Sequence, residues 1–242
     1  MRILVFSDIH GNFVALEAVL ADAGEIDTYW FLGDLVGYGP NPNECVDRVS
    51  QLPNLICLLG NHDAAAVDQI DVETFNPEAR ISLEWTQDQL TAEHSAYLED
   101  LPLVYADDLV TLAHGSPRSP VFEYLLDNQM ATENFPHFFT PFCFVGHTHL
   151  PSIFQMANGD PFARLSIPKA NTEFVLEPRT IINPGSVGQP RDRDPRAAYA
   201  IFDTETALWD YRRVDYDVVE VQSRMRKAGL PERHSLRLEI GW

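Results

Sequence analysis

The chain has 242 residues, of which 45% are hydrophobic and 22% charged, as in an ordinary globular domain. Its 36 acidic and 17 basic side chains give a net charge of −19, which argues against general nucleic-acid binding and against docking on anionic membranes. No apolar stretch approaches the roughly 20 residues that cross a bilayer, and polar residues interrupt the N-terminal run too early for a signal peptide. The three cysteines form no CxxC pair, which fits a reducing compartment. We therefore expect a cytoplasmic protein.

Short apolar runs recur along the chain, and each ends in a cluster of polar residues. Such runs, bounded by glycine or polar residues, are typical of buried strands. They occupy residues 2–6, 28–32, 54–59, 109–113, 142–145 and 180–182. Between the first two, residues 12–23 place apolar side chains on one helical face and stop at Gly24. The strand–helix–strand order predicts a sheet that is at least partly parallel.

Residues 64–108 predict a helical, cap-like insertion. The Asn-Pro pair at 76–77 is a preferred helix start, and apolar side chains recur at roughly helical spacing through residue 101. This segment could form a lid over a site. Its Trp85 and Tyr97 could stack on a base, although aromatic residues at helical spacing more often serve packing.

After residue 150 the pattern changes to strands and turns. The predicted segments are 152–160, 162–167, 172–178, a hairpin around 203–205 and a closing helix over 218–227. No internal repeat or long linker interrupts the sequence. We predict one domain over residues 1–242 that contains the helical insertion.

The polar clusters at the run ends contain carboxylate, imidazole and amide side chains. The set comprises Asp8, His10, Asp34, Asn61, His62, Asp63, His114, His147 and His149. Five of the eight histidines belong to it. In open α/β sheets, ligand sites lie beyond the carboxyl ends of the strands, so these side chains are expected to meet. Glycine-asparagine and glycine-aspartate turns would account for any single motif, but not for a potential metal ligand in every one.

The donor types and their number predict two metal ions. Oxygen and nitrogen donors without thiolate suit manganese, iron, zinc or magnesium. The ligands exceed what one tetrahedral metal needs and fit two metals that share a carboxylate. Two metals about 3.5–4 Å apart are a known arrangement for phosphoryl chemistry.

The ordered motifs resemble those of the calcineurin-like metallophosphoesterases. The pattern D-x-H, GD, GNH(D/E), H and GHxH appears here at residues 8–10, 33–34, 60–63, 114 and 146–149. It covers the chain to about residue 150, and the segment NPGSVGQPR further on is similar to the small bacterial and archaeal members. The resemblance implies a four-layer α/β-β/α sandwich.

The resemblance also assigns roles. The first metal would take Asp8, His10, Asp34 and His149, and the second Asp34, Asn61, His114 and His147. Asp34 would bridge the two metals, and a bridging hydroxide would attack phosphorus. His62 would protonate the leaving oxygen, with Asp63 orienting it. Manganese is the favoured metal, and iron, zinc, nickel and magnesium are alternatives.

One departure from the family pattern narrows the predicted activity. Ser/Thr phosphatases and symmetrical dinucleoside tetraphosphate hydrolases carry an arginine in GDxVDRG, whereas this chain has GDLVGYGP at 33–40. It looks more like the compact phosphodiesterases, including asymmetrical dinucleoside tetraphosphate hydrolases. We predict hydrolysis of a small phosphodiester or nucleotide-type substrate. The alternatives are a phosphomonoesterase, a non-catalytic metal-binding scaffold and, disfavoured by the acidity, a repair nuclease. A homo-oligomer is an open alternative.

Three side chains are candidates for contacting the substrate. Arg118 and Arg191 could grip a phosphate, because guanidinium binds it bidentately, but surface ion pairs would explain them equally well. Tyr38 could line the rim of the site or belong to a rigid glycine-proline turn. Asn12 is expected to cap the first helix rather than to contact substrate.

Overall fold

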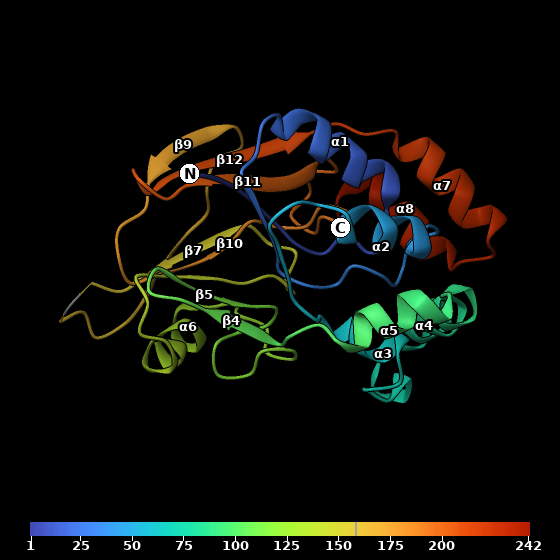
Figure 1. Cartoon of the computed structure of the whole chain (residues 1–242), viewed down its shortest axis with the longest axis horizontal. Helices are drawn as coiled ribbons and strands as arrows, with labels where there is room; N and C mark the ends of the chain where they lie inside the picture. Colours follow the sequence, from blue (N-terminus) through green and yellow to red (C-terminus); the bar gives the residue numbers. More distant parts are fainter. Residues whose placement is uncertain (158) are drawn as a thin grey trace.

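Two mixed β-sheets form the centre of the molecule, and helices lie on their outer sides (Figure 1). The structure is a computed structural model that describes residues 1–157 and 159–242. Each sheet has six strands.

The first sheet has the strand order β3-β2-β1-β11-β12-β9. Its strands are β3 (Leu55–Cys57), β2 (Thr28–Phe31), β1 (Arg2–Phe6), β11 (Ala197–Asp203), β12 (Leu208–Val214) and β9 (Thr172–Val175). β1, β2 and β3 pair in parallel, and the other three strands extend the sheet by antiparallel pairing. The loops that follow the three parallel strands therefore leave the sheet at one edge.

The second sheet has the order β4-β5-β6-β10-β7-β8. Its strands are β4 (Val104–Ala106), β5 (Val110–Ala113), β6 (Phe142–Phe144), β10 (Thr180–Asn183), β7 (Ser152–Gln155) and β8 (Arg164–Ser166). Here β5, β6 and β10 are parallel, and β4, β7 and β8 pair in the antiparallel sense. The C-terminal ends of β5, β6 and β10 therefore also lie together at one edge of their sheet.

The helices are α1 (Phe13–Ala23), α2 (Pro42–Ser50), α3 (Asn61–Ala66), α4 (Pro77–Gln89), α5 (Ala92–Glu99), α6 (Asn128–Asn134), α7 (Val218–Lys227) and α8 (Glu232–Ile240), with 3-10 turns η1 (Val72–Thr74) and η2 (Phe135–His137). Asn12 caps α1, because its side-chain oxygen accepts a hydrogen bond from the Ala15 N–H, a contact typically worth about 1 kcal/mol. Gly24 follows the helix with φ 71°, a conformation that glycine adopts without steric cost.

Strand β1 shows how alternate side chains build two separate apolar layers. Ile3 and Val5 face a cluster between the sheets, which also holds Phe144 and Trp209, with ring centroids 5.2 Å apart. Leu4 and Phe6 point the other way, into a cluster under α1 and α2. Because both faces are covered, the strand reads as a continuous apolar run.

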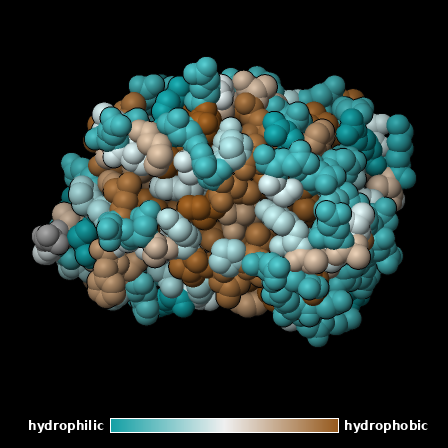
Figure 2. All heavy atoms as spheres, viewed as in Figure 1, coloured by the Kyte–Doolittle hydropathy of each residue, from teal (hydrophilic) through white to brown (hydrophobic). Residues whose placement is uncertain are grey.

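Helix α6 and the turn η2 cover the outer face of the second sheet. Ala131 and Phe135 pack there against Cys143 and Ile181. The layers are therefore helices, sheet, sheet and helices, which confirms the predicted four-layer α/β-β/α sandwich. Figure 2 shows hydrophobic side chains gathered across the middle of one face, between hydrophilic surfaces.

Most of the predicted elements are present. All six predicted strands appear within a residue or two of their predicted ends, and the hairpin of β11 and β12 and helix α7 are confirmed. In the predicted segment 152–160, Asn158 lies outside the described residues.

The predicted insertion differs from expectation in two ways. Its main helix is broken into α4 and α5, because Leu90 is extended and Thr91 caps the second helix by accepting from the His94 N–H. Strand β4 also falls inside the range 64–108 and joins the second sheet. Helices α2, α6 and α8 lie outside every predicted helical segment.

Among the described residues, no helix is both long enough and apolar enough to cross a bilayer.

Candidate metal centre

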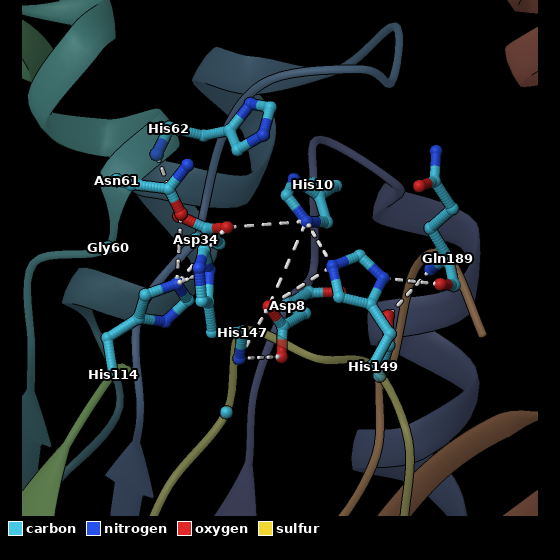
Figure 3. Close-up of polar contacts among 12 residues, drawn as sticks. Asp8, His10, Asp34, Gly60, Asn61, His62, His114, His147, His149 and Gln189 are labelled. Atoms are coloured by element: carbon cyan, nitrogen blue, oxygen red, sulfur yellow. Dashed lines mark hydrogen bonds and ion pairs between the residues drawn. The ribbon is translucent and has the colours of Figure 1, made fainter. Parts of the chain in front are cut away.

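The side chains singled out at the strand ends come together at one edge of the sandwich (Figure 3). Asp8 and His10 follow β1, Asp34 follows β2, and the remaining residues follow β3, β5 and β6. Parallel strands of both sheets end at this edge, so loops far apart in sequence become neighbours. Every one of these side chains is buried: Asp8, His10, Asp34, Asn61, His114, His147 and His149.

Four of these side chains form a first potential metal site, made of Asp8, His10, Asp34 and His149. Their donor atoms all lie within 4.8 Å of one another. His10 Nε2 is 3.0 Å from His149 Nε2 and 3.5 Å from Asp34 Oδ2, and His149 Nε2 is 3.4 Å from Asp8 Oδ1. One cation could reach all four donors.

A second potential site shares Asp34 with the first and adds His114 and His147. His114 Nε2 lies 3.3 Å from Asp34 Oδ2, 3.1 Å from His147 Nδ1 and 3.2 Å from Asn61 Oδ1. The first group has the same members as the first ligand set that the resemblance implied, and the second group has three of the four members of the second set, with Asn61 placed beside His114.

In three of the histidines, the ring nitrogen that points away from the donor cluster is hydrogen-bonded. That bond determines which nitrogen of the ring carries the proton. His10, His114 and His149 each direct Nδ1 at a backbone carbonyl: those of Val36 at 3.1 Å, Leu32 at 3.0 Å and Gln189 at 2.5 Å. A carbonyl only accepts, so in the neutral imidazole the proton sits on Nδ1 and Nε2 carries a lone pair. Such carbonyl contacts usually orient histidines that bind metal.

The facing lone pairs require a positive charge between them. In the neutral tautomers just assigned, His10 Nε2 and His149 Nε2 are both acceptors and cannot hydrogen-bond to each other at 3.0 Å. A divalent cation satisfies both nitrogens together with the neighbouring carboxylates. The residues present therefore fit a metal ion.

Electrostatics support the same conclusion. Burial lowers the pKa of His10 and His149 well below 6.5, and that of His147 to about 3, so these imidazoles are neutral at pH 7. Burial raises the pKa of Asp34, but the charges of His114, His62 and His10 and the hydrogen bond with His114 together outweigh burial and hold that pKa well below 3.8. Burial lowers the pKa of His114, but the charge and hydrogen bond of Asp34, with the charges of Asp8 and Asp63, together raise it to about 9. The buried carboxylate thus needs a cationic neighbour.

The backbone is unusual at the same residues. Asp8, His10, Asp34, His147 and His149 all have φ between 49° and 64°, a region that non-glycine residues rarely occupy. Each such residue costs of order 1–3 kcal/mol and persists where the surrounding structure fixes it. Clustering of this strain around one point is typical of a functional site.

The Asp63 carboxylate is hydrogen-bonded to the backbone around Asp34. Its carboxylate accepts hydrogen bonds from the backbone N–H groups of Asp34 at 2.8 Å, Val36 at 3.0 Å and Gly60 at 3.0 Å. These bonds fix the loop that presents Asp34. The described hydrogen bonds of this carboxylate all go to the backbone, and orientation of the His62 ring by Asp63 stays a prediction.

Gly60 makes a close approach to the shared carboxylate. A Cβ at this position would overlap both Oδ1 and the backbone nitrogen of Asp34. We expect Gly60→Ala to lower the free energy of unfolding by about 1–3 kcal/mol and to reduce bound metal, measured by thermal unfolding and elemental analysis. Gly24→Ala, whose methyl group would meet nothing within 4 Å, should keep its full metal content. Full metal content in Gly60→Ala would contradict this account.

His62 lies beside the cluster rather than inside it (Figure 3). Its backbone N–H donates to Asp34 Oδ1 at 2.9 Å, and its ring centroid is 4.8 Å from that of His10. Burial lowers its pKa to about 4. His62 Nδ1 is buried and has no hydrogen-bond partner in residues 1–157 and 159–242.

A pocket of about 250 Å³ opens next to His62. Its walls include Asn61, His62, His147, Tyr38, Phe75 and Tyr124. Phe75 meets the His62 ring edge-on at 5.1 Å, and Tyr124 stacks on His147 at 3.8 Å. Neither aromatic residue could be predicted from the sequence, since no motif marks them and they lie in connecting segments.

The three predicted substrate residues have different surroundings. Tyr38 is buried against the centre, with its ring 4.7 Å from His10 and 4.4 Å from His62. Arg191 lies over the Tyr38 ring at 5.8 Å. Arg118 is instead engaged by Glu123 and Glu133, and the structure does not bring it to the cluster.

Two further aromatic candidates serve packing. Trp85 packs against the apolar cluster of α7 and α8, and Tyr97 packs against the cluster under α1 and α2. Neither is among the residues that line the pocket.

Several known proteins are similar to this chain. A metallophosphoesterase from Sphaerobacter thermophilus, known from its crystal structure, shares 48% identity, covers 100% of this chain and 99% of its own, and superposes with a TM-score of 0.92. An uncharacterised protein of Methanocaldococcus jannaschii is 35% identical over 99% of this chain and 98% of its own length. A symmetrical bis(5'-nucleosyl)-tetraphosphatase of Vibrio cholerae is 33% identical over 111 residues, which are 39% of this chain and 41% of that protein.

The family assignment follows from the profile match together with these relatives. The profile of the calcineurin-like phosphoesterase superfamily domain matches residues 1–207. The chain therefore belongs to the calcineurin-like phosphoesterase superfamily and is a phosphoric ester hydrolase with a buried aspartate–histidine cluster suited to divalent metal.

Proposed function

We propose that this chain hydrolyses a small phosphodiester or nucleotide-type substrate at a centre of two divalent metals. The observation that carries the proposal is the pair of buried donor groups that share Asp34. Asp8, His10 and His149 would complete the first position, and Asn61, His114 and His147 the second. Manganese is the favoured metal, because it accepts both carboxylate and imidazole donors.

Bound metals would polarise the phosphoryl oxygens and lower the pKa of a bound water. The chain supplies the geometry for this chemistry. Asp63 holds the loop of Asp34, and backbone carbonyls fix the imidazole orientations, so little reorganisation is needed when substrate arrives.

His62 is proposed to give a proton to the leaving oxygen. Its ring lines the pocket beside Asn61 and His147, within reach of a phosphate held there. Burial keeps its pKa near 4, and an anionic phosphate alongside would raise this pKa toward neutrality. Protonation would thus be coupled to substrate binding.

The pocket suits a small substrate with an aromatic group. Its volume is about 250 Å³, and Phe75, Phe122 and Tyr124 provide apolar rings beside the proposed metal positions. Phe122 is 58% exposed and Tyr124, which covers His147 with one face, is 42% exposed, so both rings offer surface to a ligand. The net charge of −19 disfavours long polyanions, and similarity to a tetraphosphatase supports a nucleotide-type substrate. The asymmetrical mode of tetraphosphate cleavage stays a prediction from GDLVGYGP.

The proposal is tested with the purified chain and chromogenic esters. Manganese-loaded protein is expected to hydrolyse bis(4-nitrophenyl) phosphate faster than 4-nitrophenyl phosphate, and chelation followed by dialysis should abolish both activities. Adding back manganese, zinc, nickel or magnesium would rank the metals. Turnover that survives complete removal of metal would contradict the proposal, and faster cleavage of the monoester would favour a phosphomonoesterase.

A further inference from the structure

Among the described residues, no hydrogen bond from outside the donor cluster orients the ring of His147. The other three donor imidazoles are each held through Nδ1 by a backbone carbonyl. His147 instead turns Nδ1 toward the centre, 3.1 Å from His114 Nε2. Its remaining nitrogen, Nε2, is buried and has no hydrogen-bond partner in residues 1–157 and 159–242. The His147 backbone N–H donates to Asp8 at 3.2 Å, but this bond does not fix the rotation of the side chain.

The ring of Tyr124 lies against the His147 ring. The two ring centroids are 3.8 Å apart and the ring planes differ by 24°, so one face of the imidazole is covered. Stacking of this kind restricts the rotation of both rings. Both residues line the pocket of about 250 Å³. The stack therefore stands where the other three imidazoles have a carbonyl contact.

The loop that carries Tyr124 is fixed by contacts of its own. Glu123, the preceding residue, accepts hydrogen bonds from Ser116 Oγ at 2.6 Å, Asn134 Nδ2 at 2.8 Å and Arg118 Nε at 3.0 Å. Asn134 belongs to α6, so these bonds join the loop to the helix that covers the second sheet. The position of the Tyr124 ring is thus set by protein contacts on the far side from the donor cluster.

We propose that Tyr124 is a positioning residue of the second metal site, and that its ring holds the His147 imidazole with Nδ1 directed at the metal. This inference rests on the proposed function, since it requires the second donor group to bind a metal. Outer contacts that orient a metal-binding ring typically contribute about 10- to 100-fold to metal affinity. Here the orienting contact is an aromatic face and not a carbonyl oxygen.

The test is calorimetric titration of the metal-free full chain with manganese. Tyr124→Ala is expected to weaken binding at the second site by about 10- to 100-fold and to leave the first site unchanged, because the first site keeps both of its carbonyl-held imidazoles. Anomalous scattering from crystals grown with limiting manganese identifies the weakened position. Tyr124 is 42% exposed, so the variant should stay folded, which thermal unfolding checks. Tyr124→Phe keeps the stacking ring and should restore both affinities.

Phe122→Ala is the matched control for metal binding. It removes an aromatic ring from the same loop and from the wall of the same pocket, and Phe122 is 58% exposed. The ring that stacks on His147 is that of Tyr124, which this variant keeps. Both manganese affinities should therefore equal those of the wild type.

A second readout needs no metal. In crystals of metal-free Tyr124→Ala, the His147 ring should turn away from its stacked position. The rings of His10, His114 and His149 should stay in place, because their carbonyl contacts are intact. These three rings serve as internal controls in the same crystal.

Three results would overturn the inference. They are wild-type manganese affinity at both sites in Tyr124→Ala, an equal loss at both sites, and a His147 ring that keeps its position without the stack. Metal affinity and ring position do not depend on turnover, so the two proposals can fail separately. A chain that cleaves no ester but loses second-site affinity in Tyr124→Ala would keep this inference and lose the proposed activity. Ester hydrolysis with metal binding that is independent of Tyr124 would do the reverse.

Discussion

Asp34→Asn is expected to lower turnover of bis(4-nitrophenyl) phosphate by about 10³-fold or more, because the lost metal chemistry supplies several kcal/mol of transition-state stabilisation. Asp34 Oδ2 is 3.5 Å from His10 Nε2 and 3.3 Å from His114 Nε2, so it belongs to both donor groups. An amide has no charge to hold two cations. Elemental analysis of the purified variant should show well under two metals per chain.

The control for Asp34→Asn is Asp100→Asn, which makes the same change at an exposed position at the end of α5. It should keep both metals and full turnover. Thermal unfolding separates loss of metal from loss of fold. An Asp34→Asn protein that retains two metals and wild-type turnover would contradict the assignment of Asp34 as the ligand that both metals share.

His62→Ala is expected to lower kcat by about 10²–10⁴-fold while metal content stays at the wild-type value. Metal content should be unaffected because the His62 ring lies beside the two donor groups but belongs to neither of them. The loss should be larger for an alkyl leaving group than for 4-nitrophenolate, which departs readily without a proton. Rates for the two kinds of diester, measured at equal metal occupancy, provide the check.

His137→Ala is a matched control, since His137 is exposed in the turn η2 and lies outside the pocket lining. It should leave both rates unchanged. If His62→Ala lost metal in proportion to activity, or lost both diester activities equally, the residue would be a positioning group and not the proton donor.

The donor cluster could be predicted from sequence because its members follow apolar runs directly. Asp8 comes two residues after β1 ends, and His147 comes three residues after β6 ends. A parallel sheet brings such ends together whatever the loops between them contain. The strand pattern and the donor chemistry were therefore sufficient to predict the cluster without side-chain detail.

The rim of the pocket could not be predicted in the same way. Arg118 and Arg191 look alike in sequence, and only tertiary structure shows that Glu123 and Glu133 neutralise the first. The role of Asp63 likewise depends on where three backbone N–H groups point. These contacts come from packing between distant segments, which local patterns do not encode.

The binuclear assignment is tested most directly by anomalous X-ray scattering from crystals of the manganese-loaded chain. Two peaks are expected about 3.5–4 Å apart, one among Asp8, His10 and His149 and the other among Asn61, His114 and His147, with an Asp34 oxygen between them. A single peak at full occupancy, or two peaks that do not share Asp34, would contradict it.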